Sequence, residues 1–412
     1  MRRSRILLAG ARGSARALVV AATLAGCTAG ASGSAGSPPG GGSAPSTSAP
    51  PATSAPSTSA PPATSAPRTT GGVAVSATPR MFAFYYLWWD PAHWRARLGP
   101  SYPLGRIPEP LPARLGPDGC QPTSLYPGNQ LTDVSSPLYD ESNPAQIATD
   151  VREAASAGLA GFAVAWAGTG GSGQSAGSSL YNTRLAMLVD AVEGYDAAGG
   201  HFTLWVSYMS SSRIRTEQAM NNDFAYLRAA YGSSPAFDRS NGGLPTLILM
   251  GSRKYPLGLL DPLSTAWRKY FYLVGDENWR TWSAARAALF DADQYYWSSE
   301  PPTAASYSDI ASLAAMVRSE RNPDGSAKKF FSPLAPGYDK QLAGGTNCVP
   351  RAGGQTMREL YAGNSSAHPD AWLVISWNEI TEGTYVVPLE RYGTQSLVTL
   401  ASIISGTSTG GA

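Results

Sequence analysis

The sequence predicts a (β/α)8 barrel, an α/β fold in which eight parallel strands alternate with helices and close into a ring. Two observations point to this fold. Short apolar runs recur along residues 80–407 and alternate with segments of helical periodicity, as in consecutive βα units. The last run, 372–377, leads directly into two carboxylates, Glu379 and Glu382. Functional side chains of parallel barrels collect at the carboxyl ends of the strands, which is where this pair is expected to lie.

Eight runs rich in β-branched and aromatic residues are candidate strands, the number that a closed barrel requires. They cover 81–88, 161–167, 202–208, 245–250, 270–274, 288–291, 329–333 and 372–377. Helices are expected at 144–158, 181–198, 217–230, 306–321, 355–362 and 390–404. Asn143 is expected to cap the first helix, with Pro144 in its first turn. The unit over 257–277 has no clear period, and long Gly/Pro-rich loops are expected at 97–142 and 168–179.

The segment before the barrel contains two parts. Residues 1–26 combine five arginines, an apolar stretch and small residues directly before Cys27, which resembles a bacterial lipoprotein signal peptide. The resemblance implies cleavage before Cys27 and lipidation of its thiol, so that the protein is held on the outer face of the cell membrane or is extracellular. An unprocessed signal or a membrane helix is the alternative, although the apolar stretch is shorter than the roughly 20 residues that a spanning helix needs.

Residues 27–79 consist almost entirely of Ala, Ser, Thr, Pro and Gly, and the stretch 43–53 begins again at Ser54. Such a composition has too few apolar residues to offset the entropy lost on folding. We therefore expect a disordered tether, which at a polyproline rise of about 3.1 Å per residue could reach on the order of 150 Å.

Charge and cysteine content limit the possible partners. The formal net charge is +2, and because residues 1–26 hold five arginines and no acid, the remainder carries −3. No basic footprint for nucleic acid is present, and we expect a monomer that contacts the membrane only through its lipid anchor. Apart from Cys27, the cysteines are Cys120 and Cys348, which either form a disulfide in this oxidising compartment or remain free thiols.

Three other motifs have less support. The stretch 168–173 fits a Gly-rich dinucleotide fingerprint, but it continues as a Gly/Ser-rich loop instead of opening a helix. The stretch 173–177 has the form of a nucleophile elbow, which requires a tight strand-to-helix turn and a histidine base, and the chain has three histidines. Asp291 and Asp293 could hold a cation, orient a sugar hydroxyl or cap a turn. We therefore expect no metal and no cofactor.

Aromatic side chains gather at the predicted strand ends, where they could either pack in the core or line a groove. Aromatic faces stack on the C–H-rich faces of sugar rings, and the polar tips of Trp and Tyr bind hydroxyl groups. Taken together, they favour a groove for an oligo- or polysaccharide. The candidate binding residues are Tyr86, Trp88, Trp89, Trp166, Tyr208, Asp291, Trp297, Tyr338, Trp377 and Asn378.

The run Trp377-Asn-Glu-Ile-Thr-Glu-Gly-Thr384, followed by Pro388, resembles the last-strand signature of glycoside hydrolase family 99 and the related family 71. The segments 84–88, 161–166 and 336–339 are similar to the family in kind and order. Ile380 and Thr381 depart from the pattern, because family members usually carry Trp and His there.

The resemblance implies an endo-acting enzyme that cleaves α-linked mannosides or glucans with retention of configuration. In the family's proposed route, the first glutamate assists attack by the sugar's own 2-hydroxyl and the second protonates the leaving oxygen. By position, Glu379 would be the base and Glu382 the acid. A non-catalytic glycan-binding lipoprotein on the same barrel is the alternative, and a transglycosylase or an α-glucanase similar to family 71 is a third possibility.

Overall fold

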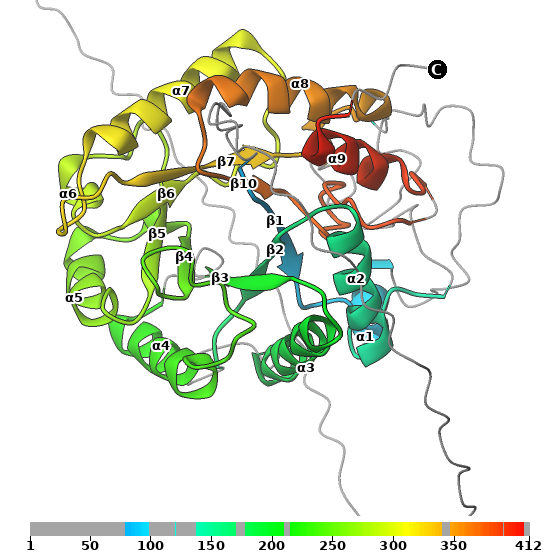
Figure 1. Ribbon diagram of the computed structural model, residues 1–412, viewed down its shortest axis with the longest axis horizontal. Helices are drawn as coiled ribbons and strands as arrows, with labels where there is room; N and C mark the ends of the chain where they lie inside the picture. Colours follow the sequence, from blue (N-terminus) through cyan, green and yellow to red (C-terminus); the bar gives the residue numbers. More distant parts are fainter. Residues whose placement is uncertain are drawn as a thin grey trace, which may run out of the picture. The chain divides into compact units, whose positions relative to one another are not determined.

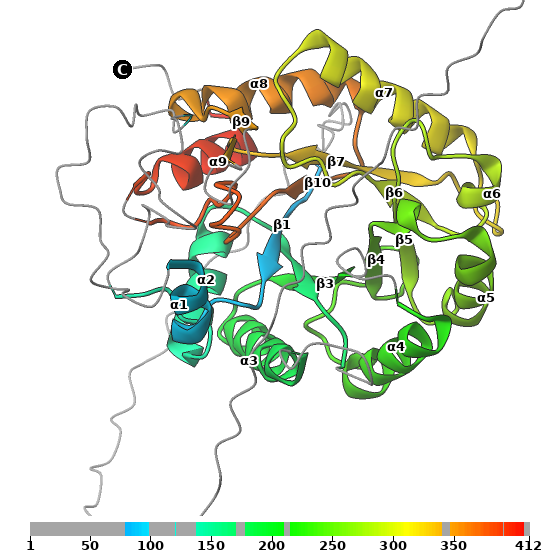
Figure 2. The ribbon, with the colours of Figure 1, turned by 180° about the vertical axis from the view of Figure 1, so that it is seen from behind.

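Eight parallel strands close into a barrel in the order β1-β10-β7-β6-β5-β4-β3-β2. The computed structural model describes residues 79–98, 120, 137–169, 178–209, 215–339, 347–389 and 391–407. Figures 1 and 2 show the strands at the centre and the helices around them. The predicted (β/α)8 barrel is confirmed.

The interior of the barrel is filled by aromatic side chains from several strands. The barrel strands are β1 (Met81–Tyr86), β2 (Gly161–Trp166), β3 (Thr203–Met209), β4 (Thr246–Met250), β5 (Tyr272–Asp276), β6 (Ala292–Gln294), β7 (Lys329–Leu334) and β10 (Ala371–Val374). Trp205 stacks on Phe82 with ring centroids 3.9 Å apart and lies 4.9 Å from Phe331. Gly161 makes room for the ring of Phe82, because a Cβ there would lie 2.9 Å from that ring and 1.9 Å from the carbonyl oxygen of Thr203. The core therefore depends on large rings beside a residue without a side chain.

Helices cover the outside of the barrel. They are α2 (Pro144–Ser156), α3 (Ser178–Ala197), α4 (Glu217–Tyr231), α5 (Leu257–Trp267), α6 (Ala284–Ala287), α7 (Ala304–Ser319), α8 (Gln355–Asn364) and α9 (Gln395–Ser405). The predicted start of α2 is confirmed, since the side chain of Asn143 accepts a hydrogen bond from the amide of Ala145 at 3.0 Å. Helix α5 forms where the sequence has no clear period. Among the described residues, no helix is long and apolar enough to cross a membrane.

Two predicted strands are displaced along the sequence. Strand β5 begins at Tyr272, not at Tyr270, and β6 covers Ala292–Gln294, not 288–291. The apolar pair Leu289 and Phe290 is buried, but it packs before the strand begins. Apolar content alone does not separate a strand from the buried turn that precedes it. Asp291 consequently lies at the amino end of β6.

The first and last predicted strands are shorter than expected at their carboxyl ends. Strand β1 ends at Tyr86 and β10 ends at Val374. After β10 the peptide bond between Ile375 and Ser376 is cis, and the amide of Ser376 donates to the carbonyl of Thr384 at 2.8 Å. The segment that carries the two glutamates is therefore a closed turn at the barrel mouth.

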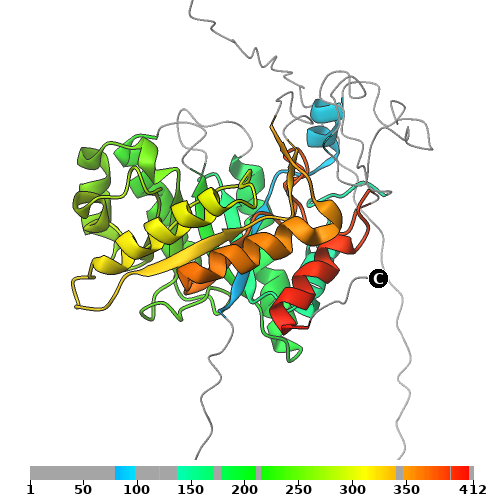
Figure 3. The same cartoon turned by 90° about the horizontal axis from the view of Figure 1, so that it is seen from above.

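Two small elements stand near this turn. Helix α1 (Pro91–Leu98) follows β1, and Figure 3 shows it lying beyond the end of that strand. Strands β8 (Tyr338–Asp339) and β9 (Cys348–Val349) form an antiparallel pair after β7. The chain thus places additional structure on the face of the barrel where the strands end.

Candidate active site at the carboxyl ends of the strands

A cavity of about 300 Å³ opens where the barrel strands end. Its walls come from β1, β3, β4 and β5 and from the segments that follow β1, β4, β6 and β10. The lining residues are Tyr86, Trp88, Met209, Met250, Arg253, Lys254, Asp276, Tyr296, Ser298, Glu379 and Glu382. The structure thus brings together four residues that the sequence singled out, Tyr86, Trp88, Glu379 and Glu382.

Glu379 is held by the residues on either side of it in the turn. Its side chain is 3% exposed, and its backbone amide donates to the hydroxyl of Ser376 at 2.7 Å. One carboxylate oxygen, Oε1, accepts from the amide of Thr381 at 3.0 Å and also from the Thr381 hydroxyl. Thr381 therefore orients Glu379 through both its backbone amide and its hydroxyl.

Glu382 is half-buried, and contacts with Asp339 and Arg351 hold the backbone around it. Its carbonyl accepts from the amide of Asp339 on β8 at 2.7 Å. The next residue, Gly383, has a φ of +62°, and a Cβ there would lie 3.0 Å from the Cβ of Asp339. The buried side chain of Arg351 donates to the carbonyls of Gly383 at 2.9 Å and Tyr385 at 2.8 Å. This part of the turn therefore depends on the β8–β9 pair and on one arginine.

Three tyrosines lie in the electric field of the two glutamates. The hydroxyls of Tyr86 and Tyr296 are 2.6 Å apart. Burial, followed by Glu379 and Glu382, raises the pKa of Tyr86 well above its ordinary value, and burial, Tyr86 and Glu382 do the same for Tyr296. Burial and then the two glutamates raise the pKa of Tyr338 to about 12. All three phenols remain protonated at neutral pH and can donate hydrogen bonds.

Asn378 joins the ends of β1 and β10 and does not line the cavity. Its Oδ1 accepts from the amide of Tyr86 at 2.8 Å, and its Nδ2 donates to the carbonyl of Tyr86 at 3.0 Å and to Oε1 of Glu141 at 2.9 Å. The carbonyl of Asn378 accepts from the indole of Trp89 at 2.6 Å. The structure therefore gives Asn378 and Trp89, both buried, a positioning role instead of the predicted contact with sugar.

Three other predicted aromatics point away from the cavity, toward the helices. The indole of Trp166 donates to Asn182 on α3 at 2.7 Å, and the hydroxyl of Tyr208 donates to Asp223 on α4 at 2.6 Å. Trp377 is fully buried and lies 5.4 Å from the ring of Phe162. Successive residues of a strand face opposite sides, so an aromatic at a strand end can equally belong to the outer core. The prediction that Trp166, Tyr208 and Trp377 contact substrate does not agree with this placement.

The structure also places Asp291 away from the predicted site. It lies before β6 and pairs with Arg268, and it lines a separate cavity of about 530 Å³ with residues that begin β5 and β7. Its predicted place at the barrel mouth followed from the strand boundary error. This second cavity is larger, but it lies at the amino ends of the strands, where barrels place stabilising residues.

Trp88, Trp297 and Tyr338 are nearer to the site. Trp88 stacks on Tyr86 with ring centroids 4.4 Å apart, and together the two rings form one wall of the cavity. Trp297 is half-exposed and packs against Trp279 and Tyr295 at 5.4 and 5.5 Å, beside the lining residue Tyr296. Trp297 and Tyr338 thus border the site without lining this cavity.

Several lining residues were not predicted. Arg253 and Asp276 form an ion pair at 2.7 Å, and Asp276 also accepts from the amides of Gly251 at 2.6 Å and Tyr296 at 2.9 Å. Burial raises the pKa of Asp276, while Arg253 opposes that rise. Asp276 is the last residue of β5, and a correct end for that strand would have identified it. Arg253 and Lys254 follow β4, where no sequence motif marks them.

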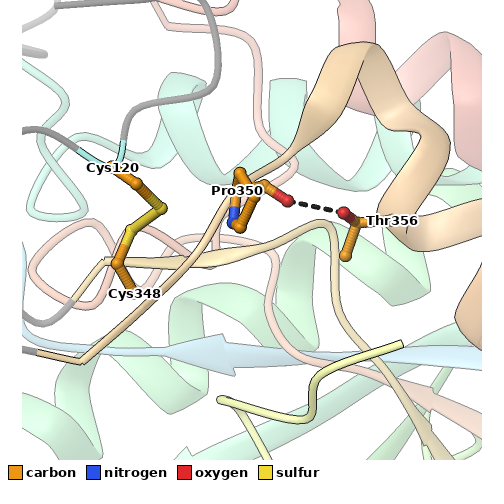
Figure 4. Close-up of a disulfide and its surroundings, with 4 residues drawn as sticks. All are labelled: Cys120, Cys348, Pro350 and Thr356. Atoms are coloured by element: carbon orange, nitrogen blue, oxygen red, sulfur yellow. Dashed lines mark hydrogen bonds between the residues drawn. A yellow bond between two sulfur atoms is a disulfide. The ribbon is translucent and has the colours of Figure 1, made fainter. Parts of the chain in front are cut away.

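A disulfide joins Cys120 to Cys348, which decides between the two alternatives for this pair. Figure 4 shows the bond beside Pro350 and Thr356. Cys348 is in β9 and pairs with Asp339, the residue that holds the carbonyl of Glu382. The disulfide is therefore linked to the catalytic candidates through two backbone contacts.

Other predictions fall wholly or mainly outside the described residues. The signal peptide, Cys27, the tether and residues 170–177 of the Gly-rich loop belong to this group. Within the described ranges, no group of three or more His, Cys, Asp or Glu side chains is placed to hold a metal ion.

The barrel resembles solved structures of carbohydrate-active enzymes. Two structures of the glycoside hydrolase family 99 endo-alpha-mannosidase from Bacteroides thetaiotaomicron, one with bis-tris propane, align with TM-scores of 0.59 and 0.57 at 17% identity, over 81% of this chain and 98% of theirs. A glycoside hydrolase-like protein aligns with a TM-score of 0.54 at 13% identity, over 80% of this chain and 95% of its own. No protein-family model and no curated protein sequence matches the chain. At these identities, the likeness shows a shared fold.

Proposed function

We propose that this protein is a glycoside hydrolase that cleaves α-linked glycans of the mannan or α-glucan type, in an endo-acting and retaining mode. The observation that carries the proposal is the presence of Glu379 and Glu382 on the wall of one cavity at the carboxyl ends of the strands. Most glycoside hydrolases use two carboxylates that flank the glycosidic bond to be cleaved. The alignment with an endo-alpha-mannosidase along most of the chain supports the choice of α-mannosides.

In the proposed first step, the 2-hydroxyl oxygen of the sugar attacks the anomeric carbon while Glu379 takes the hydroxyl proton. Glu382 donates a proton to the leaving glycosidic oxygen, so one C–O bond forms and one breaks. Water then opens the anhydro-sugar with the proton transfers reversed, and two inversions give net retention. General acid and base groups of this kind typically contribute 10²–10⁴-fold each.

The contacts of Glu379 support its role as the base. Thr381 gives Glu379 two donors, which suits the carboxylate that must accept a proton. Glu382 is half-buried on the same cavity, and its role as the acid follows from its position in the family 99-like run. Tyr86 and Tyr296 offer hydroxyl groups to sugar oxygens on the same wall.

The test is Glu382→Gln, a change that keeps the side-chain shape but removes the proton donor. We expect loss of new reducing ends by at least about 10²-fold, with oligosaccharide binding retained in isothermal titration. Glu359→Gln is the matched control, because Glu359 is an exposed carboxylate on α8 that contacts Gln355. Unchanged hydrolysis by Glu382→Gln would exclude the proposed acid.

A second candidate, a non-catalytic glycan-binding protein, is favoured by one observation. Ile380 and Thr381 stand where members of family 99 usually carry Trp and His, and the fully buried Ile380 offers no polar group to a sugar. Titration of α-mannan and α-glucan oligosaccharides alongside product analysis separates the two functions. Affinity without any new reducing end would support the binding protein.

We further propose that the protein acts as a monomer on the outer face of the cell membrane, anchored through Cys27. The lipoprotein-like residues before Cys27 and the Ser/Thr/Pro-rich composition of residues 27–79 support this location. Cell fractionation tests the location, and sedimentation of the purified barrel tests the monomer.

A further inference from the structure

The cavity has two walls of opposite charge. Glu379 and Glu382 lie on the segment after β10, whereas Arg253 and Lys254 lie on η2 (Ser252–Lys254), directly after β4. In the ring order of the strands, β4 is four places from β10 in either direction, which is the greatest separation that eight strands allow. The cations therefore face the glutamates across the barrel mouth.

The two cations differ in how they are balanced. Arg253 donates through Nη1 to the side chain of Asp276 at 2.7 Å and to its carbonyl at 2.8 Å, and its guanidinium lies 5.2 Å from the ring centroid of Tyr295. Lys254 is exposed, and among the described residues it forms no ion pair and no side-chain hydrogen bond. The pair Arg253–Asp276 is neutral overall, so Lys254 leaves this wall with one positive charge.

The proton transfers proposed for Glu379 and Glu382 do not require a cation at the position of Lys254. A charge that supported Glu379 or Glu382 would be expected on a neighbouring strand, whereas Lys254 is on the opposite wall. The lining beside η2 includes the apolar side chains of Met209 and Met250, at the ends of β3 and β4, which can adapt to different sugar faces but do not pair with a cation. A lysine ammonium at the edge of a groove is a compact point charge suited to sulfate, phosphate or carboxylate.

We infer that the glycan carries an anionic group, a sulfate, phosphate or carboxylate, on the sugar that lies against the β4 wall, and that Lys254 selects for it. The inference rests on the proposed function, because the glycan must lie across the same cavity. Lys254 acts on specificity and takes no part in the proton transfers. Lys254 contributes only to the affinity for the charged sugar.

Binding is measured by isothermal titration in Glu382→Gln, with a neutral α-manno-oligosaccharide and the same chain carrying one 6-sulfate, one 6-phosphate or one uronic acid. At low ionic strength, we expect at least one charged probe to bind about tenfold more tightly than the neutral one, as one charge-assisted contact provides. The advantage falls as salt is added. Comparison of the three charged probes shows whether the preferred anionic group is a sulfate, a phosphate or a carboxylate.

Lys254→Gln tests the residue. We expect it to remove the preference for the charged probe while leaving affinity for the neutral probe unchanged, and Lys254→Glu to reverse the preference. Lys269→Gln is the matched control, because Lys269 is also exposed but lines the cavity at the amino ends of the strands. Loss of affinity for both probes in Lys254→Gln would overturn the inference.

The outcome separates this inference from the proposed function. Hydrolysis of neutral chains with no preference for charged ones would overturn the inference and leave the hydrolase intact. Preferential binding of a charged probe without any cleavage would support Lys254 and contradict the hydrolase. Absence of binding to every probe would overturn both.

Discussion

At the scale of single residues, buried polar side chains hold the two glutamates of the site in position. Thr381 lies between the two glutamates in sequence, and through its hydroxyl and amide it fixes Oε1 of Glu379. Asn378 has no contact with the cavity, but its amide group joins the end of β1 to the segment that carries both glutamates. The positions of the two proposed catalytic groups thus depend on buried amides and hydroxyls that do not line the cavity.

Buried carboxyl groups away from the cavity make the stability of the barrel depend on pH. Glu300 is 1% exposed, and its two oxygens accept from the side-chain amide of Asn364 at 3.0 and 3.1 Å. Burial raises the pKa of Glu300 from 4.5 to about 8. Between these values the folded protein keeps a proton that the unfolded chain has lost, so the free energy of unfolding falls by about 1.4 kcal/mol per pH unit as pH rises.

Glu300→Gln removes this proton while preserving the side-chain shape. We expect the stability of the variant relative to wild type to rise by about 2–3 kcal/mol between pH 5.5 and 7.5, measured by urea unfolding at each pH. Glu359→Gln, on the surface of α8, is the control and should show no such trend. Parallel pH dependence in wild type and Glu300→Gln would contradict the assignment.

At the scale of elements, the sequence was sufficient for the type and order of the strands but not for all their ends. Runs with clear turn signals, such as β2 and β7, appear close to where they were predicted. Strand β6 does not, because Leu289 and Phe290 are as apolar as a strand but pack in the preceding turn. That shift placed Asp291 at the wrong end of the barrel, and the separate shift of β5 concealed Asp276 at the end of that strand.

The same limit explains which site residues could be predicted. Glu379 and Glu382 were identifiable because a motif marks them, and Tyr86 because it ends a well-defined strand. Whether Trp166, Tyr208 and Trp377 point into the barrel mouth or toward the helices depends on the exact position of each residue along the chain. A shift of one residue reverses the side that a side chain faces. Arg253 and Lys254 follow β4 in a short helical turn without a motif, so only the closed barrel brings them opposite the glutamates.

The β8–β9 pair connects the disulfide to the site. Cys348 pairs with Asp339 across the two strands, and the amide of Asp339 holds the carbonyl of Glu382 at 2.7 Å. Loss of the Cys120–Cys348 bond would free β9 from one of its attachments. Since small displacements of a reacting group are costly to catalysis, the effect should appear in turnover.

We expect Cys120→Ser to lower kcat by about tenfold with little change in KM, measured on the substrate that wild type cleaves. Far-UV circular dichroism should remain that of the barrel, because the eight barrel strands do not include either cysteine. Cys348→Ser and the double variant should match Cys120→Ser, which separates loss of the bond from effects of a free thiol. Equal kcat in all four proteins would show that the disulfide does not position Glu382.

At the scale of the whole molecule, the barrel contains everything that the proposed reaction needs. Among the described residues, the buried core runs from Met81 to Ile403, and each residue of the cavity lies within these bounds. Closure of the ring brings together side chains from β1 and from the segment after β10, nearly 300 residues apart in sequence. Anchoring and catalysis are therefore expected to be separable functions of one chain.

Cys27→Ser tests this separation. We expect the variant to move from the membrane fraction to the medium, because stable attachment depends on the lipidated thiol, while kcat/KM on soluble oligosaccharides stays unchanged. A chain of residues 80–407 is the control for the barrel alone, and its Tm should lie within about 2 °C of the full-length value, which for a domain of this size corresponds to about 1.4 kcal/mol or less. A lower kcat/KM in either protein would mean that residues before the barrel contribute to the site, and retention of Cys27→Ser on membranes would exclude the thiol as the anchor.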